Sequence, residues 1–247
     1  MSNAYYAPGE QRAAKVNELF ARIARRYDLI NDLQSFGLHR QWKRQVVKLA
    51  AVQQGGSALD LCCGTGDISF ALARNGATVT GLDFSAEMLA VAAQRKNKVT
   101  KTLTAAITAG PVFIQGDAQQ IPFPNDTFDA VTVGYGLRNL TSWERGLDEM
   151  HRVAKPGGRL VVLDFGKPPN ALWRSLYFAH LNCSVPLIGL LFCGNAQAYA
   201  YILESLKKYP AQLAVAEKMR ALNLKNVRVI NLLGGAMAIN YGEKPSA

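Results

Sequence analysis

The sequence predicts an α/β fold with a mostly parallel sheet of seven strands. Three observations support this prediction. Short apolar segments typical of buried strands alternate with longer segments of helical periodicity, and the 247 residues, 49% of them hydrophobic, suffice for one sizeable core. A glycine-containing turn also follows the first expected strand, at Gly64-Thr65-Gly66. Strands and helices in alternation are typical of right-handed crossovers between parallel strands.

Helices are expected before the first strand. From Val16 to Ile30, apolar residues recur at steps of three and four with arginine and lysine between them, which indicates a basic amphipathic helix. A second helical stretch runs from about His39 to Ala51 and is followed by a Gln-Gln-Gly-Gly segment. We therefore expect an N-terminal helical cap over residues 1–56.

The remaining elements follow in the order that such a sheet requires. Strands are expected at 57–61, 78–82, 112–115, 128–134, 159–165, 227–232 and 236–241, and helices at 68–75, 85–95 and 142–153. The sheet domain then comprises residues 57–169 and 210–247. Residues 170–209 interrupt the alternation with aromatics and an apolar run, so we expect an insertion over the active site.

Charge and cysteine content limit the classes of protein that fit. A net charge of +10 predicts attraction to something anionic, which could be nucleic acid, a membrane surface or an acidic substrate. The four cysteines show neither a metal-site spacing nor a disulfide framework, so we expect no metal and a reducing cytoplasm. The N-terminus lacks a signal-peptide core, and no stretch reaches the ~20 apolar residues that cross a bilayer. A soluble or peripheral protein is expected.

The turn after the first strand predicts a cofactor site. Glycines in Gly64-Thr65-Gly66 let the backbone approach a ligand, and Asp83 ends the second strand roughly 20 residues later, where a carboxylate accepts hydrogen bonds from ribose hydroxyls. Asp60 before the turn and Asp67 after it would repel the pyrophosphate of a dinucleotide but attract a cation. The pattern therefore favours S-adenosylmethionine, with its sulfonium and ammonium groups, over NAD.

The third and fourth strands complete the expected cofactor site. Asp117 follows the third strand, where a carboxylate can hold the adenine amino group, and Gly134 ends the fourth. The residues expected to bind the cofactor are Asp60, Gly64, Thr65, Gly66, Asp83, Phe84, Asp117, Ala118 and Gly134.

Three segments resemble the ubiquinone/menaquinone-biosynthesis C-methyltransferases, a family of class I S-adenosylmethionine-dependent methyltransferases. They are Tyr27 to Trp42, where Tyr-Asp, Asn, Ser, His and Trp fall at the family's spacing, Gly134 to Asn139, and Arg152 to Phe165. The chain departs from the family's pattern at Ile30, Gln34, Gly134, Ala154, Asp164, Gly166 and Asn240. The match spans roughly Arg22 to Lys244.

This resemblance implies a Rossmann-like fold and C-methylation of a polyprenylated quinol. An aromatic carbon is a poor nucleophile until a neighbouring hydroxyl is deprotonated, so the site must stabilise a phenolate, and Arg138 is expected to do so. Because arginine stays protonated, the proton must leave through a water or to a neighbour such as His39 or Asp28. The expected catalytic residues are Arg138, Asn139 and His39, and the expected substrate-binding residues are Tyr27, Asn31 and Tyr201.

Several substrates and functions remain open at this point. Demethylmenaquinol is favoured because 59–64 and 163–165 resemble menaquinone- and phylloquinone-type members, with a benzoquinol of ubiquinone synthesis or another lipophilic or small molecule as alternatives. An NAD-dependent dehydrogenase and a non-catalytic quinone- or lipid-binding protein are more distant. No nucleic-acid partner is expected, because 134–139 contains neither an Asn/Asp-Pro-Pro-aromatic motif nor a nucleophilic cysteine.

Apolar and basic residues outside the sheet predict contact with other surfaces. Leu172, Trp173, Tyr177, Phe178 and 185–192 could form a groove for the isoprenoid tail or, alternatively, the interface of a homodimer. The basic helix at 12–26 could lie on anionic lipid, since each basic residue near such a surface contributes ~1 kcal/mol. The sequence therefore predicts a cytoplasmic protein that can be peripheral on the inner face of the membrane, with a merely solvated helix face as the alternative.

Overall fold

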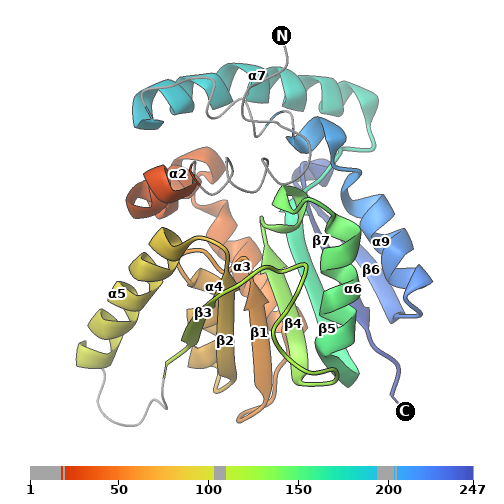
Figure 1. Cartoon of the computed structure of the whole chain (residues 1–247). Coiled ribbons are helices and arrows are strands. Elements are labelled where there is room, and N and C mark those ends of the chain that lie inside the picture. The colour runs from red at the N-terminus through yellow and green to blue at the C-terminus, as the bar shows by residue number, and fades with distance from the viewer. Residues whose placement is uncertain (1–17, 19, 103–109, 194–202, 204, 247) are drawn as a thin grey trace.

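The computed structural model describes residues 18, 20–102, 110–193, 203 and 205–246, and it confirms the α/β fold (Figure 1). The strands are β1 (Ser57–Leu61), β2 (Thr78–Asp83), β3 (Val112–Gln115), β4 (Phe128–Gly134), β5 (Ala154–Phe165), β6 (Lys225–Leu232) and β7 (Met237–Glu243). They form a seven-stranded sheet in the order β3-β2-β1-β4-β5-β7-β6. The first five pair in parallel, and β7 runs antiparallel to β5 and β6.

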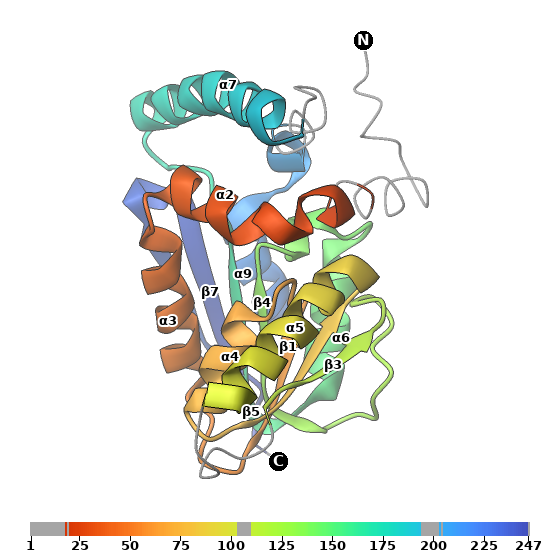
Figure 2. The ribbon, with the colours of Figure 1, turned by 90° about the vertical axis from the view of Figure 1, so that its left-hand side faces the viewer.

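Helices cover both faces of this sheet. The described helices are α2 (Tyr27–Ser35), α3 (Leu38–Ala50), α4 (Asp67–Arg74), α5 (Ala86–Thr102), α6 (Trp143–Val153), α7 (Ala171–Cys193) and α9 (Ala211–Ala221), with short 3-10 turns η1 (Ala24–Arg26), η2 (Leu137–Asn139) and η3 (Leu233–Gly235). In Figure 2, α3, α4 and α5 lie on one side of the sheet, and α6 and α9 on the other. Since α3 packs on β4 and β5, this part of the expected N-terminal segment belongs to the helical layer of the sheet.

Alternation along the strands divides the core into two layers. Successive side chains of a strand point to opposite faces. On β5, Val161 packs with Val46 of α3, whereas its neighbour Leu160 packs with Met150 of α6. Burial on both faces explains why the central strands are almost wholly apolar.

Two helices lie above the carboxyl ends of the parallel strands. Figures 1 and 2 both show α7 across the top of the molecule, with α2 between it and the sheet. A third apolar cluster joins them, in which Ile23 and Ile30 pack with Met88 of α5 and with Leu181 and Val185 of α7. The segment expected as an insertion therefore contains a 23-residue helix, although Pro186 lies within it.

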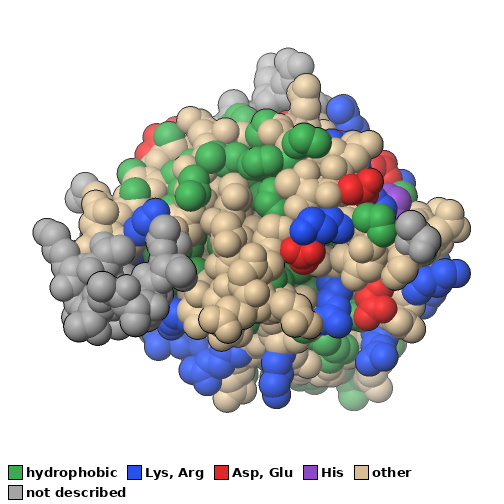
Figure 3. Space-filling model, turned by 90° about the horizontal axis from the view of Figure 1, so that it is seen from below, with side chains coloured by type: hydrophobic (Ala, Val, Ile, Leu, Met, Phe, Trp, Pro, Cys, Tyr) green, Lys and Arg blue, Asp and Glu red, His purple; other side chains and the backbone are tan. Residues whose placement is uncertain are grey.

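Among the described residues, no helix is both long enough and apolar enough to cross a membrane. The opposite end of the sheet, seen from below in Figure 3, carries Lys and Arg side chains around its rim with Asp and Glu among them. Large apolar side chains are also exposed on α2 and α7.

Candidate functional site

A cleft opens at the carboxyl edge of the sheet, where ligands of open α/β sheets bind. Its empty volume, which includes the open solvent at its mouth, is about 810 Å³. We call it the main cleft. It is lined by Phe20, Tyr27, Cys62, Gly64, Leu82, Asp83, Phe84, Ser85, Met88, Gly116, Asp117, Ala118, Gln119, Gly134, Tyr135, Gly136, Asn139, Leu140 and Thr141.

The glycine turn after β1 forms one wall of the main cleft. Gly64 lines the cleft with a φ of +55°, and Gly66 begins α4 with a φ of +86°, both in the left-handed region that favours glycine. A Cβ on Gly66 would lie 2.8 Å from the Cζ atom of Phe113, so only glycine fits beneath this ring. Gly66 therefore shapes the turn without lining the cleft itself.

Asp83 ties this turn to the end of β2. Its Oδ2 accepts a hydrogen bond from the Gly64 backbone N–H at 2.7 Å, and its Oδ1 accepts one from the Ser85 N–H at 2.9 Å. Burial raises the pKa of Asp83, although backbone hydrogen bonds from Ser85, Gly64 and Phe84 lower it. Each carboxylate oxygen still has a second lone pair for a hydroxyl in the cleft.

The loop after β3 lines the other side of the main cleft. Asp117 accepts a hydrogen bond from the Gln119 backbone N–H at 2.8 Å, and the Gln119 side chain in turn accepts one from the Ser142 N–H at 2.8 Å. Ala118 is buried beside them. Asp117 and Ala118, both expected from the sequence to bind the cofactor, thus line the main cleft.

A smaller side pocket adjoins the main cleft on the far side of the glycine turn. We call it the side pocket; it is lined by Tyr27, Lys43, Asp60, Cys62, Cys63, Gly64, Thr65, Asp67, Ile68, Gly134 and Tyr135. Two expected cofactor residues, Asp60 and Thr65, lie here and do not line the main cleft. Tyr27, Gly64 and Gly134 belong to both spaces.

Asp60 is a buried carboxyl group between two hydroxyls. Ser69 Oγ donates to its Oδ2 at 2.6 Å, and Thr132 Oγ1 donates to its Oδ1 at 2.9 Å. Burial raises its pKa from 3.8 to about 6, although both hydrogen bonds act in the opposite direction. The folded chain thus holds this proton at a pH where the unfolded chain has already lost it.

This shift predicts a pH-dependent contribution of Asp60 to stability. Because the folded pKa lies above the unfolded one, the contribution is fully present below about pH 4 and is lost as the pH rises through about 6. We expect the unfolding free energy of Asp60→Asn, relative to the wild type, to rise by about 2–3 kcal/mol between about pH 4 and pH 7. Urea unfolding of both proteins across this range measures the difference; a flat difference would contradict a raised pKa.

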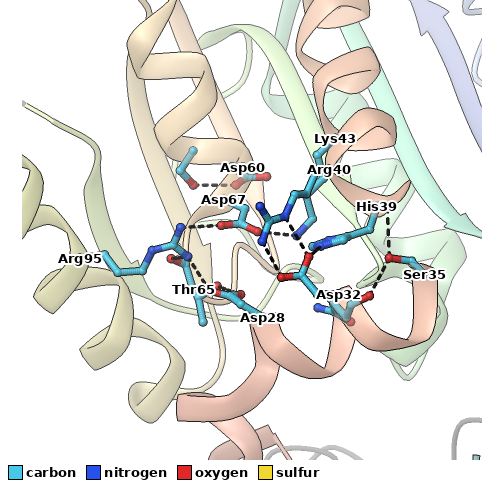
Figure 4. A network of polar contacts seen from close by, with 12 residues as sticks. Asp28, Asp32, Ser35, His39, Arg40, Lys43, Asp60, Thr65, Asp67 and Arg95 are labelled. Carbon is cyan, nitrogen blue, oxygen red and sulfur yellow. Dashed lines mark hydrogen bonds and ion pairs between the residues drawn. The ribbon is translucent and has the colours of Figure 1, made fainter. Parts of the chain in front are cut away.

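A chain of ion pairs holds α2 and α3 on the glycine turn (Figure 4). Thr65 Oγ1 and Arg95 Nη1 both donate to Asp28 of α2, at 2.8 and 3.1 Å. Asp67 lies between two cations, with Lys43 Nζ at 2.7 Å and Arg95 Nη2 at 2.6 Å. Although burial alone would raise it, these cations lower the pKa of Asp67 to about 2.

The ion pairs correct the expected role of Asp67. This residue was expected to attract a cationic cofactor, but its charge is balanced by Lys43 and Arg95 of the chain itself. Its place after the turn therefore says little about the charge of the ligand. These contacts join residues more than 20 positions apart, and nothing in the local sequence pattern indicates them.

Arg138 lies in the interior behind the main cleft. Its side chain is only 5% exposed and that of its partner Asp164 3%, with Arg138 Nε 3.3 Å from Asp164 Oδ1. Its Nη1 donates to Asn139 Oδ1 at 2.8 Å and to Ser205 Oγ at 2.9 Å, and the guanidinium stacks on the Phe165 ring at 4.8 Å. Burial raises the pKa of Asp164, and Arg138 counteracts this. Asn139 lines the cleft, whereas Arg138 stands directly behind it.

The other residues expected at the substrate site are spread over the cap. Tyr27 lines both pockets, but His39 and Asn31 line neither. His39 Nε2 lies 2.8 Å from Asp32 Oδ1, and burial lowers the His39 pKa. The Nδ1 of His39 and the Nδ2 of Asn31 are buried without a hydrogen-bond partner among the described residues. Tyr201 lies outside the described residues.

Sequence reasoning missed several residues of the main cleft. Phe20, Ser85, Met88 and Tyr135 line it, although none was expected to bind a ligand. Phe20 and Met88 are apolar residues at helical spacing, which the pattern assigns to a core. Tyr135 stands within the Gly134 to Asn139 motif, and its place there was the one available signal.

Comparison with known proteins gives a consistent match. Residues 9–244 match the model of the ubiE/COQ5 methyltransferase family. The ubiquinone/menaquinone biosynthesis C-methyltransferase UbiE of Azotobacter vinelandii is 39% identical over 241 residues, which cover 96% of this chain and 93% of that protein. The demethylmenaquinone methyltransferase of Desulfitobacterium hafniense is 40% identical, with 96% and 92% covered.

A solved structure supports the fold independently of sequence. The crystal structure of a SAM-dependent methyltransferase from Thermotoga maritima superposes with a TM-score of 0.63 at 16% identity, covering 92% of this chain and 98% of that one. At this identity the likeness concerns the fold alone. The similarity in sequence to the two bacterial enzymes is what bears on chemistry.

Proposed function

Because the chain belongs to the ubiE/COQ5 methyltransferase family, we propose that it transfers the methyl group of S-adenosylmethionine to a ring carbon of a polyprenylated quinol. The observation that carries the proposal is the main cleft, which lies at the carboxyl edge of the sheet between Asp83 and the Gly134 to Asn139 motif. Asp83, a carboxylate for the cofactor, and Asn139, which accepts a hydrogen bond from the buried Arg138, thus line one space.

The residues of the two pockets fit the cofactor. Asp83 would accept from the ribose hydroxyls, and Asp117 would hold the adenine amino group beside Ala118. The amino-acid end would enter the side pocket, where Lys43 can meet its carboxylate and Asp60 lies close to the ammonium. Bound S-adenosylmethionine supplies an electrophilic methyl group on a positively charged sulfur.

The chain's own contribution to the reaction is the stabilisation of a phenolate. A quinol hydroxyl must lose its proton before the adjacent ring carbon becomes a strong nucleophile. Arg138 provides a fixed positive charge held by Asp164, and Asn139 links it to the cleft. Such a charge favours the anion in a poorly hydrated site. Because arginines stay protonated in proteins, the proton leaves through water; His39 and Asp28, the other candidate acceptors, line neither pocket and would receive it only by such a relay.

Among quinols we favour a naphthoquinol. The relative named for ubiquinone and menaquinone biosynthesis and the relative named for demethylmenaquinone are 39% and 40% identical to this chain. Overall similarity therefore does not separate a benzoquinol from a naphthoquinol substrate. The preference rests on the segments 59–64 and 163–165, which resemble menaquinone- and phylloquinone-type members. A benzoquinol of the ubiquinone branch is the alternative.

Turnover of paired substrates tests the proposal. Purified enzyme would receive a short-tailed demethylnaphthoquinol or a benzoquinol analogue under reducing conditions, together with a labelled methyl donor. We expect label on a ring carbon of the naphthoquinol, at a higher kcat/KM than for the benzoquinol. A lack of label in both, or tight binding of NAD in place of S-adenosylmethionine by calorimetry, would overturn the proposal.

We also propose that α2 and α7 touch the membrane that holds such a substrate. Large apolar side chains are exposed on both helices, namely Leu29 and Leu33 on α2, Phe36 directly after it, and Leu172, Trp173 and Leu176 on α7. The two helices lie together above the carboxyl ends of the parallel strands in Figures 1 and 2. A net charge of +10 adds attraction to anionic lipid. Much of the basic helix expected at 12–26 lies outside the described residues.

Vesicle binding checks this contact. We expect the double variant Leu172→Ser with Leu176→Ser to bind vesicles of mixed neutral and anionic lipid roughly 10- to 100-fold more weakly, because two apolar side chains no longer enter the bilayer interface. Leu213→Ser, equally exposed but on α9, is the matched control and should bind like the wild type. If the wild-type protein does not bind vesicles and forms a dimer at higher concentration, the membrane proposal is wrong and this surface is the interface of a homodimer.

A further inference from the structure

Tyr135 carries a buried hydroxyl that nothing in the described structure uses. Its oxygen is closed off from solvent and has no hydrogen-bond partner among the described residues. A buried polar group without a partner costs free energy, and a phenylalanine would fill the same space without that cost. An unpaired hydroxyl next to a binding site therefore indicates a partner that arrives with a ligand.

The backbone of Tyr135 is strained. Tyr135 has a φ of +62°, in a region that residues other than glycine rarely adopt. Its N–H donates to the Leu163 carbonyl at 2.7 Å, and its carbonyl accepts from Asn139 Nδ2 at 3.2 Å. Backbone strain of this kind persists where the surrounding structure imposes it, and strained residues are frequent at functional sites.

The location of Tyr135 favours the substrate as the missing partner. It lines both the main cleft and the side pocket, three residues before Arg138. Its ring packs edge-on against Phe165, the ring that also supports the Arg138 guanidinium. Burial raises its pKa well above the usual value, so at neutral pH the hydroxyl keeps its proton and can donate it in a hydrogen bond.

We propose that the Tyr135 hydroxyl donates a hydrogen bond to a ring oxygen of the quinol, which makes Tyr135 a substrate-contacting residue that selects for oxygenated rings. This inference rests on the proposed function, because it requires a substrate with such an oxygen. Because the Tyr135 hydroxyl is closed off from solvent, the quinol ring must displace part of the cleft wall in front of that hydroxyl to reach it. Tyr27 of α2 lines the same two pockets and belongs to that wall.

The test compares two tyrosine-to-phenylalanine variants. Tyr135→Phe should lower kcat/KM for the short-tailed demethylnaphthoquinol roughly 5- to 100-fold, since the substrate oxygen is then left unpaired. The affinity for S-adenosylmethionine should stay within about twofold, and the melting temperature should not fall, because the lost hydroxyl had no partner. Tyr241→Phe on β7, which loses a hydrogen bond to Glu243 outside the site, should be less stable with unchanged kcat/KM.

A binding measurement provides a second readout. We expect Tyr135→Phe to bind the oxidised naphthoquinone more weakly than the wild type when S-adenosylhomocysteine is present. Unchanged kcat/KM and unchanged quinone binding would overturn the inference, as would a weakened affinity for the methyl donor alone, which would make Tyr135 a cofactor contact. Failure of the proposed function looks different: the wild type itself then methylates neither quinol, and the inference fails with it.

Discussion

Arg138→Ala should lower kcat for quinol methylation by roughly 1,000-fold while the affinity for S-adenosylmethionine changes little. The loss follows from the role of a fixed positive charge, since removing one preorganised group that stabilises a developing anion costs about 100- to 1,000-fold. Cofactor affinity should persist because Arg138 does not line either pocket and its contacts run to Asp164, Asn139 and Ser205. Initial rates and calorimetry on the same preparation measure the two effects.

Stability must be separated from catalysis in this experiment. Arg138 and Asp164 form a buried ion pair, and removing one partner leaves an uncompensated carboxylate that costs about 3–5 kcal/mol. The double variant Arg138→Met with Asp164→Asn removes both charges and should recover much of that stability without recovering turnover. Arg138→Lys keeps a charge but loses the planar donor set, and should be intermediate in activity. Near-normal methylation by a folded Arg138→Ala protein would contradict the catalytic assignment.

The sheet could be predicted in detail because its signals are local. Residues 57–61, 112–115 and 128–134 form strands with the expected ends, since each is a short and mostly apolar run in the sequence. The start of α6 also has a local cause. Ser142, the first residue of the helix expected at 142–153, caps it, and its Oγ accepts a hydrogen bond from the Arg145 N–H at 3.2 Å. Because parallel strands end at one edge of the sheet, residues that follow strand ends, such as Asp83 and Asp117, could be assigned to the cleft from the sequence alone.

Among the helices of the described residues, α7 and α9 were not predicted, and the reasons are physical. In α7, Pro186 and the apolar run 185–193 around it hide the helical period. In α9, buried Val215 and Met219 face the sheet, but alanines on both faces weaken the contrast that periodicity needs. Tertiary contacts with β5, β6 and β7 stabilise α9 where the sequence pattern is weak.

The polar interior of the site was the least predictable part. Asp28, Thr65 and Arg95 meet across three elements, and Asp67 meets Lys43 and Arg95 at separations of 24 and 28 residues. No sequence period indicates which cation neutralises which acid. Formal charges alone therefore assign Asp67 to the ligand, whereas the fold pairs it with cations of the chain.

Asp83→Ala should weaken S-adenosylmethionine binding by about 100-fold or more. Two ribose hydroxyls would lose a charged acceptor, and hydrogen bonds to charged groups contribute about 1.5–3 kcal/mol each. The Gly64 and Ser85 N–H groups would lose their acceptor at the same time, which loosens the junction between the glycine turn and the end of β2. Calorimetric titration with the cofactor gives the change directly.

A ligand lacking one hydroxyl separates the contact with ribose from the support of the turn. The wild type should bind S-adenosylhomocysteine more tightly than its 2′-deoxyribose analogue, because the analogue cannot donate to Asp83. If Asp83 is the acceptor, Asp83→Ala should bind the two ligands almost equally, whereas a variant that merely distorts the turn would weaken both and keep their ratio. Asp126→Ala, which removes an exposed acid paired with Lys244, serves as the control and should keep the wild-type ratio. A preserved ratio in Asp83→Ala would mean that the ribose is held elsewhere, and that Asp83 acts only by fastening Gly64 and Ser85.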